Sequence, residues 1–179
     1  LMVLALCDIR LKEPVGKRNL IFCLDVSHST GSIDKTLEKK FMQDTVNRMD
    51  KKDFAGLIVF GKESFVEQGL TQQMIIQEIK TRPDKDRTNL EKAIQTAVGQ
   101  FPDKGDNKII LLSDGNQNMG NAIDDATLAG SLGIEIWSVP LRSWFAGNEV
   151  YIEKFQTPEN TALHTPFNIS TIITGTLNT

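Results

Sequence analysis

The stretch Asn19–Ser32, NLIFCLDVSHSTGS, decides which fold the whole chain is expected to adopt. Residues 20–24 form a continuous apolar run bounded by turn-forming residues, which is typical of a strand buried on both faces of a sheet. The run ends at Asp25, and a turn rich in hydroxyl groups follows it, with Ser27 and Ser29. Because open α/β sheets bind ligands at the carboxyl ends of their strands, this turn is a candidate functional site.

Apolar strands and amphipathic helices alternate through the middle of the chain, which predicts an α/β fold with a doubly wound, mostly parallel sheet flanked by helices. Apolar residues at helical spacing predict helices over 33–49, 71–80, 89–101 and 120–132. Apolar runs predict strands over 19–25, 53–61, 64–70, 107–113 and 134–140. The strand over 64–70 is expected to be antiparallel at the sheet edge, and Trp137 is expected in the core.

The two ends of the chain differ from this α/β part. Residues 1–9 are apolar and basic residues follow them, so they fit either an edge strand with a linker or the last turns of a membrane helix. Alternation over 149–155 and 167–173 predicts the first strands of an incomplete β-sandwich. The expected divisions are an apolar segment and linker at 1–17, the α/β domain at 18–141, and a β-rich segment at 146–179.

Composition excludes several classes of protein. The chain has 179 residues, of which 40% are hydrophobic, and this is enough for a real core. Its net charge of −3 and its lack of a basic block argue against nucleic acid as the main partner. Cys7 and Cys23 lie within apolar runs and are interpreted as buried hydrophobic residues rather than a disulfide or a metal pair. The sequence contains neither the phosphate-binding motif G-x-x-x-x-G-K-S/T nor the dinucleotide-binding motif G-x-G-x-x-G, which disfavours both kinds of ligand.

Three predicted loops bring oxygen-bearing side chains to the carboxyl side of the sheet. They supply Asp25, Ser27 and Ser29 after the first strand, Thr88 before helix 89–101, and Asp114 after strand 107–113. If the two buried strands are neighbours, their aspartates repel each other, and a divalent cation removes that repulsion. Mg²⁺ prefers hard oxygen ligands, and this set offers five of them with only two negative charges. A metal so weakly neutralised would attract a carboxylate from a partner.

This constellation resembles the metal-ion-dependent adhesion site of von Willebrand factor A domains, whose pattern is D-x-S-x-S, a distant Thr and a distant Asp. The resemblance covers about residues 18–141 and implies a non-enzymatic module that binds an acidic side chain of a partner protein through Mg²⁺ or Mn²⁺. It implies that Ser27, Ser29 and Thr88 are direct or near-direct ligands. Asp25 and Asp114 would bind mainly through waters and hydrogen bonds to the hydroxyls.

The flanking segments extend the resemblance to membrane-anchored bacterial proteins of the aerotolerance type. That likeness implies a membrane anchor, a location on the extracytoplasmic face, and work beside a MoxR-type ATPase. The sequence departs from the pattern of the von Willebrand factor A family in two places. Arg87 stands where many members of the family have glycine, and no clear helix, strand and helix follow strand 134–140. The sheet is therefore either shorter than usual or completed by residues 149–155.

Other interpretations of the same residues remain open at this point. Asp25, Ser27 and Ser29 could cap the helix that begins near residue 33, and Thr88 could cap the helix at 89. A phosphatase of the haloacid-dehalogenase type also starts with a buried strand that ends in aspartate, but it needs a second aspartate where this chain has Ser27. A structural domain with an idle metal site is the third alternative. His28 and Asn116 are weaker candidates for contact with the partner.

Overall fold

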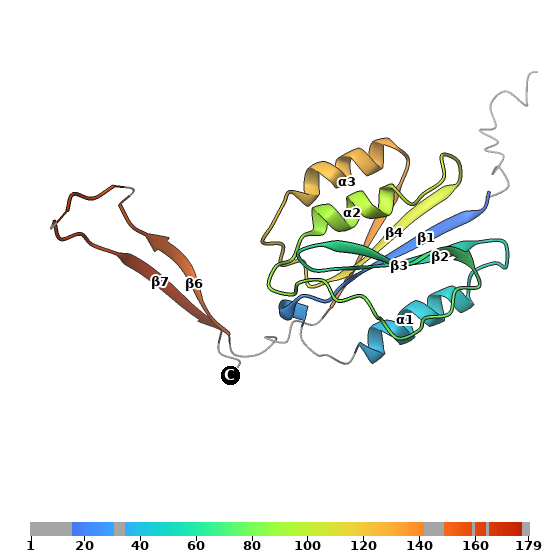
Figure 1. Cartoon of the computed structure of the whole chain (residues 1–179), viewed down its shortest axis with the longest axis horizontal. Helices are drawn as coiled ribbons and strands as arrows, with labels where there is room; N and C mark the ends of the chain where they lie inside the picture. Colours follow the sequence, from blue (N-terminus) through green and yellow to red (C-terminus); the bar gives the residue numbers. More distant parts are fainter. Residues whose placement is uncertain (1–15, 31–34, 142–148, 159, 164, 177–179) are drawn as a thin grey trace, which may run out of the picture.

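The computed structural model describes residues 16–30, 35–141, 149–158, 160–163 and 165–176, and Figure 1 shows their arrangement. A main sheet of five strands has the order β3-β2-β1-β4-β5. Its strands are β1 (Arg18–Asp25), β2 (Phe54–Phe60), β3 (Ser64–Gln72), β4 (Asp106–Ser113) and β5 (Glu135–Pro140). β1 pairs in parallel with both β2 and β4, and β5 pairs in parallel with β4. Only the pairing of β2 with β3 is antiparallel within this sheet, so the predicted mostly parallel sheet with an antiparallel edge is confirmed.

Helices cover both faces of this sheet, as a doubly wound fold requires. α1 (Thr36–Asn47) packs on one face, and α2 (Leu90–Val98) and α3 (Ala122–Ser131) lie together over the other (Figure 1). Each helix is shorter than its apolar periodicity predicts, although residues 31–34, before α1, lie outside the described part of the chain. No helix in the described residues is both long and apolar enough to cross a membrane.

β1 is buried on both faces because its side chains alternate between two cores. Leu20, Phe22 and Leu24 belong to the core beneath α1, whereas Ile21 and Cys23 belong to the core beneath α2 and α3. Full burial of one such large apolar side chain contributes about 1.5–3 kcal/mol, which explains why every residue from Leu20 to Leu24 is apolar. Cys23 is a free thiol, and burial raises its pKa, so its expected role as a hydrophobic residue is confirmed. Cys7 lies outside the described residues.

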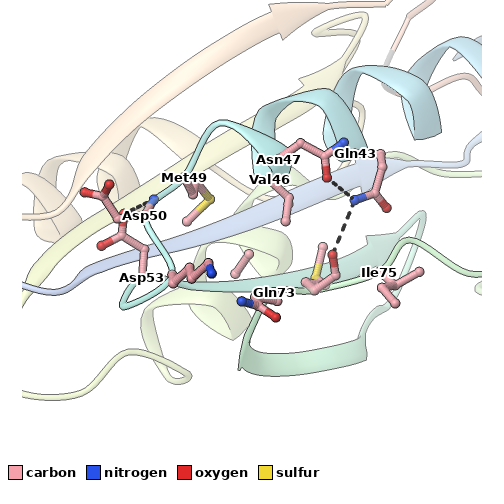
Figure 2. A pocket seen from close by; sticks show the side chains of 11 residues that line it. Gln43, Val46, Asn47, Met49, Asp50, Asp53, Gln73 and Ile75 are labelled. Atoms are coloured by element: carbon pink, nitrogen blue, oxygen red, sulfur yellow. Dashed lines mark hydrogen bonds between the residues drawn. The ribbon is translucent and has the colours of Figure 1, made fainter.

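The helix predicted over residues 71–80 is wrong. β3 continues to Gln72, Gln73 has a φ of +51°, and the chain then runs without helix towards α2. The side chain of Gln43 on α1 binds two backbone groups of this segment. Its Oε1 accepts from Ile76 N at 2.9 Å. Its Nε2 donates to Met74 O at 3.5 Å (Figure 2). Met74 is 1% exposed. Its apolar side chain is therefore buried, as the pattern indicates, but in a segment whose backbone is not helical.

The other end of that segment is held by Glu67 on β3. Its Oε1 accepts from Lys80 N at 2.9 Å, and its Oε2 accepts from Thr81 N, also at 2.9 Å. Buried or crowded backbone N–H groups need partners, and a carboxylate can accept from two of them at once. Side chains of α1 and β3 therefore fix the route that leads the chain back towards Thr88.

The outer edge of the sheet at β5 differs from the sequence expectation. Trp137 is 61% exposed, and its Nε1 donates to Glu135 Oε2 at 3.1 Å, so its expected place in the core is wrong. The physical reason is that β5 is the last strand of the sheet in the described residues. β6 (Glu149–Gln156) pairs antiparallel with β7 (Ser170–Thr176), so residues 149–155 do not complete the main sheet.

The amino end of β1 is fixed by the buried carboxylate of Asp53, which lies beside a pocket of about 420 Å³ (Figure 2). Asp53 Oδ1 accepts from Arg18 N at 3.1 Å, and Oδ2 accepts from Asp50 N, also at 3.1 Å. Arg18 Nε is 3.0 Å from Asp53 Oδ2, and Arg18 Nη2 is 2.9 Å from Asp50 Oδ2. A buried carboxylate that accepts two backbone hydrogen bonds and forms an ion pair with Arg18 thus joins β1 to the turn before β2.

Asp53→Ala is expected to lower the free energy of unfolding by about 3 kcal/mol, because it leaves two part-buried backbone N–H groups without an acceptor and removes the buried partner of the Arg18 guanidinium. Urea denaturation followed by circular dichroism measures this change. Asp50→Ala is the matched control, since its side chain also pairs with Arg18 but is 62% exposed, and it should cost less than about 1 kcal/mol. Equal effects of the two substitutions would contradict the role assigned to Asp53.

Candidate metal centre

The carboxyl edge of the sheet carries three loops that are joined to one another by hydrogen bonds. Ser113 Oγ at the end of β4 donates to Asp25 Oδ2 at the end of β1, at 2.7 Å. The loop after β1 is tied to the loop before α2, because His28 N donates to Lys85 O at 3.0 Å.

The loop before α2 is tied in turn to the loop after β4. Thr88 N donates to Asn118 Oδ1 at 3.0 Å, and Asn118 N donates back to Thr88 O at 3.2 Å. With the bonds of Ser113 and His28, these contacts connect every loop of the candidate site to the other two. The structure therefore brings together the three segments that the sequence places at this edge.

Asp25 is the most buried polar residue of the group, with no exposed surface. Its Oδ1 accepts from Ser27 N at 2.9 Å, and its Oδ2 accepts from Ser113 Oγ. Desolvation by burial raises the pKa of the Asp25 carboxyl, hydrogen bonds from Ser27 and Ser113 oppose that rise, and the charge of Asp114 adds to it. A nearby cation would stabilise the charged carboxylate that burial disfavours.

Ser27 and Ser29 present their hydroxyls side by side, with the two Oγ atoms 3.0 Å apart. They come together because residues His28–Thr30 form a single turn of 3₁₀ helix. Thr30 fixes this turn: its Oγ1 donates to Ser27 O at 3.0 Å and to Asp25 O at 3.3 Å. Ser27 is 2% exposed, so its hydroxyl is aimed by its surroundings rather than free in solvent.

Thr88 and Asp114 lie at the ends of the other two loops. Thr88 is 1% exposed, and the N-cap of α2 is Asn89, whose side chain accepts from Lys92 N at 3.0 Å. The expectation that Thr88 caps this helix is therefore wrong. Asp114 is half-buried, and it accepts from Asn116 N at 3.0 Å and from Asn116 Nδ2 at 3.2 Å.

The capping interpretation of the first loop finds no support in the described residues. α1 begins at Thr36, and its N-cap is Lys35, which makes no side-chain capping bond. Residues 31–34 lie outside the described part of the chain. The side chains of Asp25 and Ser27 make their hydrogen bonds within the candidate site, with Ser27 N, Ser113 Oγ and Ser29 Oγ.

Sequence reasoning missed four residues that shape this site. Ser113 holds Asp25, Thr30 fixes the first turn, Asn118 holds the Thr88 loop, and Lys35 Nζ donates to Thr30 Oγ1 at 2.9 Å. Ser113 could have been found, because it precedes Asp114 at the end of the same buried strand. Thr30 and Lys35 make their bonds within the segment that follows β1, where the sequence pattern does not single them out. Asn118 depends on a contact between two loops, for which the sequence carries no local signal.

The donor set suits a hard divalent cation. The described residues contain no group of three or more His, Cys, Asp and Glu placed to hold a metal, so a site made of thiolates and imidazoles does not arise there. Two carboxylates and three hydroxyls are instead the oxygen donors that Mg²⁺ and Mn²⁺ prefer. The buried Asp25 carboxylate lies next to the paired hydroxyls of Ser27 and Ser29, and its negative charge would attract such an ion.

Three solved structures share the fold. BatB from Bacteroides thetaiotaomicron matches with a TM-score of 0.55 and 22% identity over 70% of this chain and 66% of its own. An aerotolerance-related membrane protein from Bacteroides fragilis NCTC 9343 matches with a TM-score of 0.58 and 18% identity over 88% and 81%. Proximal thread matrix protein 1 from the mussel byssus, with a zinc-occupied metal-ion-dependent adhesion site, matches with a TM-score of 0.59 and 20% identity. That match covers 70% of this chain and 36% of the mussel chain.

A sequence profile gives the family itself. No curated protein matches the chain. The profile described as von Willebrand factor type A domain matches residues 20–117, more than half of the chain, and this range includes most of β1, the Thr88 loop and Asp114. This chain therefore belongs to the von Willebrand factor type A domain family.

Proposed function

We propose that this protein is a metal-dependent module for binding other proteins, and that it holds a Mg²⁺ or Mn²⁺ ion at the carboxyl edge of its sheet. The observation that carries the proposal is the pair of Ser27 and Ser29 hydroxyls, 3.0 Å apart, beside the buried carboxylate of Asp25. Membership of the von Willebrand factor A family supports it, since such domains generally mediate protein–protein interactions.

The five site residues have distinct roles in this proposal. Ser27, Ser29 and Thr88 supply hydroxyl oxygens to the ion. Asp25 and Asp114 supply its counter-charge, mainly through waters and through hydrogen bonds to the hydroxyls. Such an ion acts as a Lewis acid for one further oxygen ligand when it is bound. Because the protein contributes only two negative charges, a carboxylate of the partner is the ligand that this last position favours.

The geometry gives no support to the phosphatase alternative. The hydrogen bonds that Asp25 accepts, from Ser27 N and Ser113 Oγ, hold its carboxylate between its own loop and the end of β4. The position two residues later is Ser27, a hydroxyl that faces Ser29 rather than a second acid. We therefore propose a binding role without catalysis.

The wider setting of the module is part of the same proposal. His28, which is exposed beside the site, and Asn116, which holds Asp114, are placed to contact the partner. We propose a membrane-associated protein, which the similarity to an aerotolerance-related membrane protein supports. Its place on the extracytoplasmic face and its work beside a MoxR-type ATPase are parts of the proposal that rest on the resemblance of the flanking segments. We keep the divisions at 1–17, 18–141 and 146–179, with the binding site wholly in the second.

Addition of Mg²⁺ or Mn²⁺ is expected to raise the melting temperature of the protein. At a free metal concentration of about 100 times Kd the stabilisation is about 2.7 kcal/mol, or about 5–10 °C for a domain of this size. Differential scanning calorimetry with and without a chelator measures the shift. Asp25→Ala combined with Asp114→Ala should abolish it, whereas Asp103→Ala, an exposed aspartate before β4, should keep it. An unshifted wild-type protein would refute the metal site.

A third carboxylate in the site should separate metal binding from partner binding. Ser29→Asp is expected to tighten Mn²⁺ binding about tenfold, because a negative charge next to the ion adds to its attraction. The same charge should abolish chelator-sensitive capture of the partner in a pull-down, since it satisfies the position that the partner's carboxylate would take. Ser29→Asn, which has the same shape without the charge, is the control and should not tighten the metal.

Partner capture that survives both Ser29→Asp and the chelator would contradict a metal-bridged contact. Release of phosphate from an aryl phosphate, lost in Asp25→Ala, would instead establish the phosphatase alternative. Both readouts use the same purified proteins, so the two functions are tested side by side.

A further inference from the structure

Lys35 is a buried cation that its local environment does not favour. Its side chain is 9% exposed, although lysine is almost never so buried without a close partner. It occupies the N-cap of α1, where the helix dipole disfavours positive charge, and it makes no capping bond there. The carboxylate of Glu38 that pairs with it is 3.9 Å away, beyond hydrogen-bond reach. Something other than local helix stability must account for this lysine.

The ammonium of Lys35 reaches the candidate metal site through one residue. Lys35 Nζ donates to Thr30 Oγ1 at 2.9 Å, and the same hydroxyl donates to the backbone carbonyls of Ser27 and Asp25. This chain of hydrogen bonds ends on the turn that presents the two serine hydroxyls. Lys35 therefore lies behind the site, in contact with Thr30 and not with the five proposed ligands or counter-charges.

The charges around Lys35 show which groups it interacts with. Burial lowers the pKa of its ammonium, and Glu38 opposes this most strongly, followed by Asp25. Lys85 from the loop before α2 adds to the lowering, and Asp114 from the loop after β4 opposes it. The two carboxylates that would neutralise the metal are thus already attracted to a cation supplied by the chain.

We propose that Lys35 is a built-in counter-charge that weakens the binding of the divalent ion and leaves the metal-loaded site with a surplus positive charge. The proposal rests on the metal site argued above. The charged groups here are three carboxylates, Asp25, Asp114 and Glu38, and two ammonium groups, Lys35 and Lys85. Without metal they sum to about −1, so a bound divalent ion brings the site to about +1. Without Lys35 the loaded site would be neutral, and its attraction for an acidic side chain of the partner would be smaller.

A purely structural role for Lys35 makes a different prediction. If the lysine only supports the turn through Thr30, its removal disturbs Ser27 and Ser29 and weakens metal binding. If it acts by its charge, a replacement of similar length without the charge strengthens metal binding. The sign of the change in metal affinity therefore separates the two roles, whatever happens to stability.

Isothermal titration of the full chain with MnCl₂ tests the proposal. Lys35→Met is expected to lower Kd for Mn²⁺ about three- to tenfold, because it removes a like charge within Coulomb range of the ion. Lys35→Arg keeps the charge and should stay within about twofold of wild type. An unchanged or higher Kd in Lys35→Met overturns the proposal. Absence of Mn²⁺ binding in the wild-type protein would refute the proposed metal site itself, which is a distinguishable result.

A second variant keeps the test decisive if Lys35→Met does not fold. Glu38→Gln removes the carboxylate that partly neutralises Lys35, and its side chain lies 17% exposed on α1. We expect it to raise Kd for Mn²⁺ about two- to threefold, opposite in direction to Lys35→Met. Asp44→Asn, an exposed charge change on the same helix, should leave Kd unchanged. A Glu38→Gln protein that binds Mn²⁺ as tightly as wild type, or more tightly, overturns the proposal.

Discussion

The buried carboxylate of Asp25 is the interaction on which the arrangement of the site depends. It ends the central strand, and its two oxygens accept from Ser27 N on its own loop and from Ser113 Oγ on the neighbouring strand. A fully buried carboxylate is costly unless it is hydrogen-bonded. The fold meets that cost by using Asp25 to join the ends of β1 and β4, and the bonds of the Thr88 loop then close the group.

The strand order explains why these particular loops meet. α1 links β1 to β2 on one face of the sheet, and α3 links β4 to β5 on the other. The chain therefore leaves β1 and β4 in opposite directions, which makes their carboxyl ends the switch point at which open α/β sheets bind ligands. Asp25 and Asp114 follow the two strands that flank this switch point, so the position of the site is a consequence of the topology.

The sequence predicts features that follow from strand ends and from burial. It does not predict features that depend on contacts between segments distant in the chain. Asp25 and Asp114 could be placed because each follows a buried strand. The apolar spacing of Met74 and its neighbours predicts a helix, but Gln43 and Glu67 satisfy that segment's backbone from other elements, and no local pattern records this. Trp137 was misplaced because an apolar residue on an edge strand has the same sequence signature as one in a central strand.

Charge gives a common reason for the hydroxyl ligands and for Lys35. A site with more carboxylates would hold its metal tightly and would offer little attraction to an outside anion. In the module we propose, hydroxyl ligands at Ser27, Ser29 and Thr88, together with the ammonium of Lys35, leave the bound metal with surplus positive charge. The ion and an acidic partner would then each favour the binding of the other. Because such coupling is reciprocal, a partner that supplies the missing negative charge must also raise the affinity for the metal. The module we propose would then be most fully loaded with metal when its partner is present, which makes the metal part of the contact and not a fixed element of the fold.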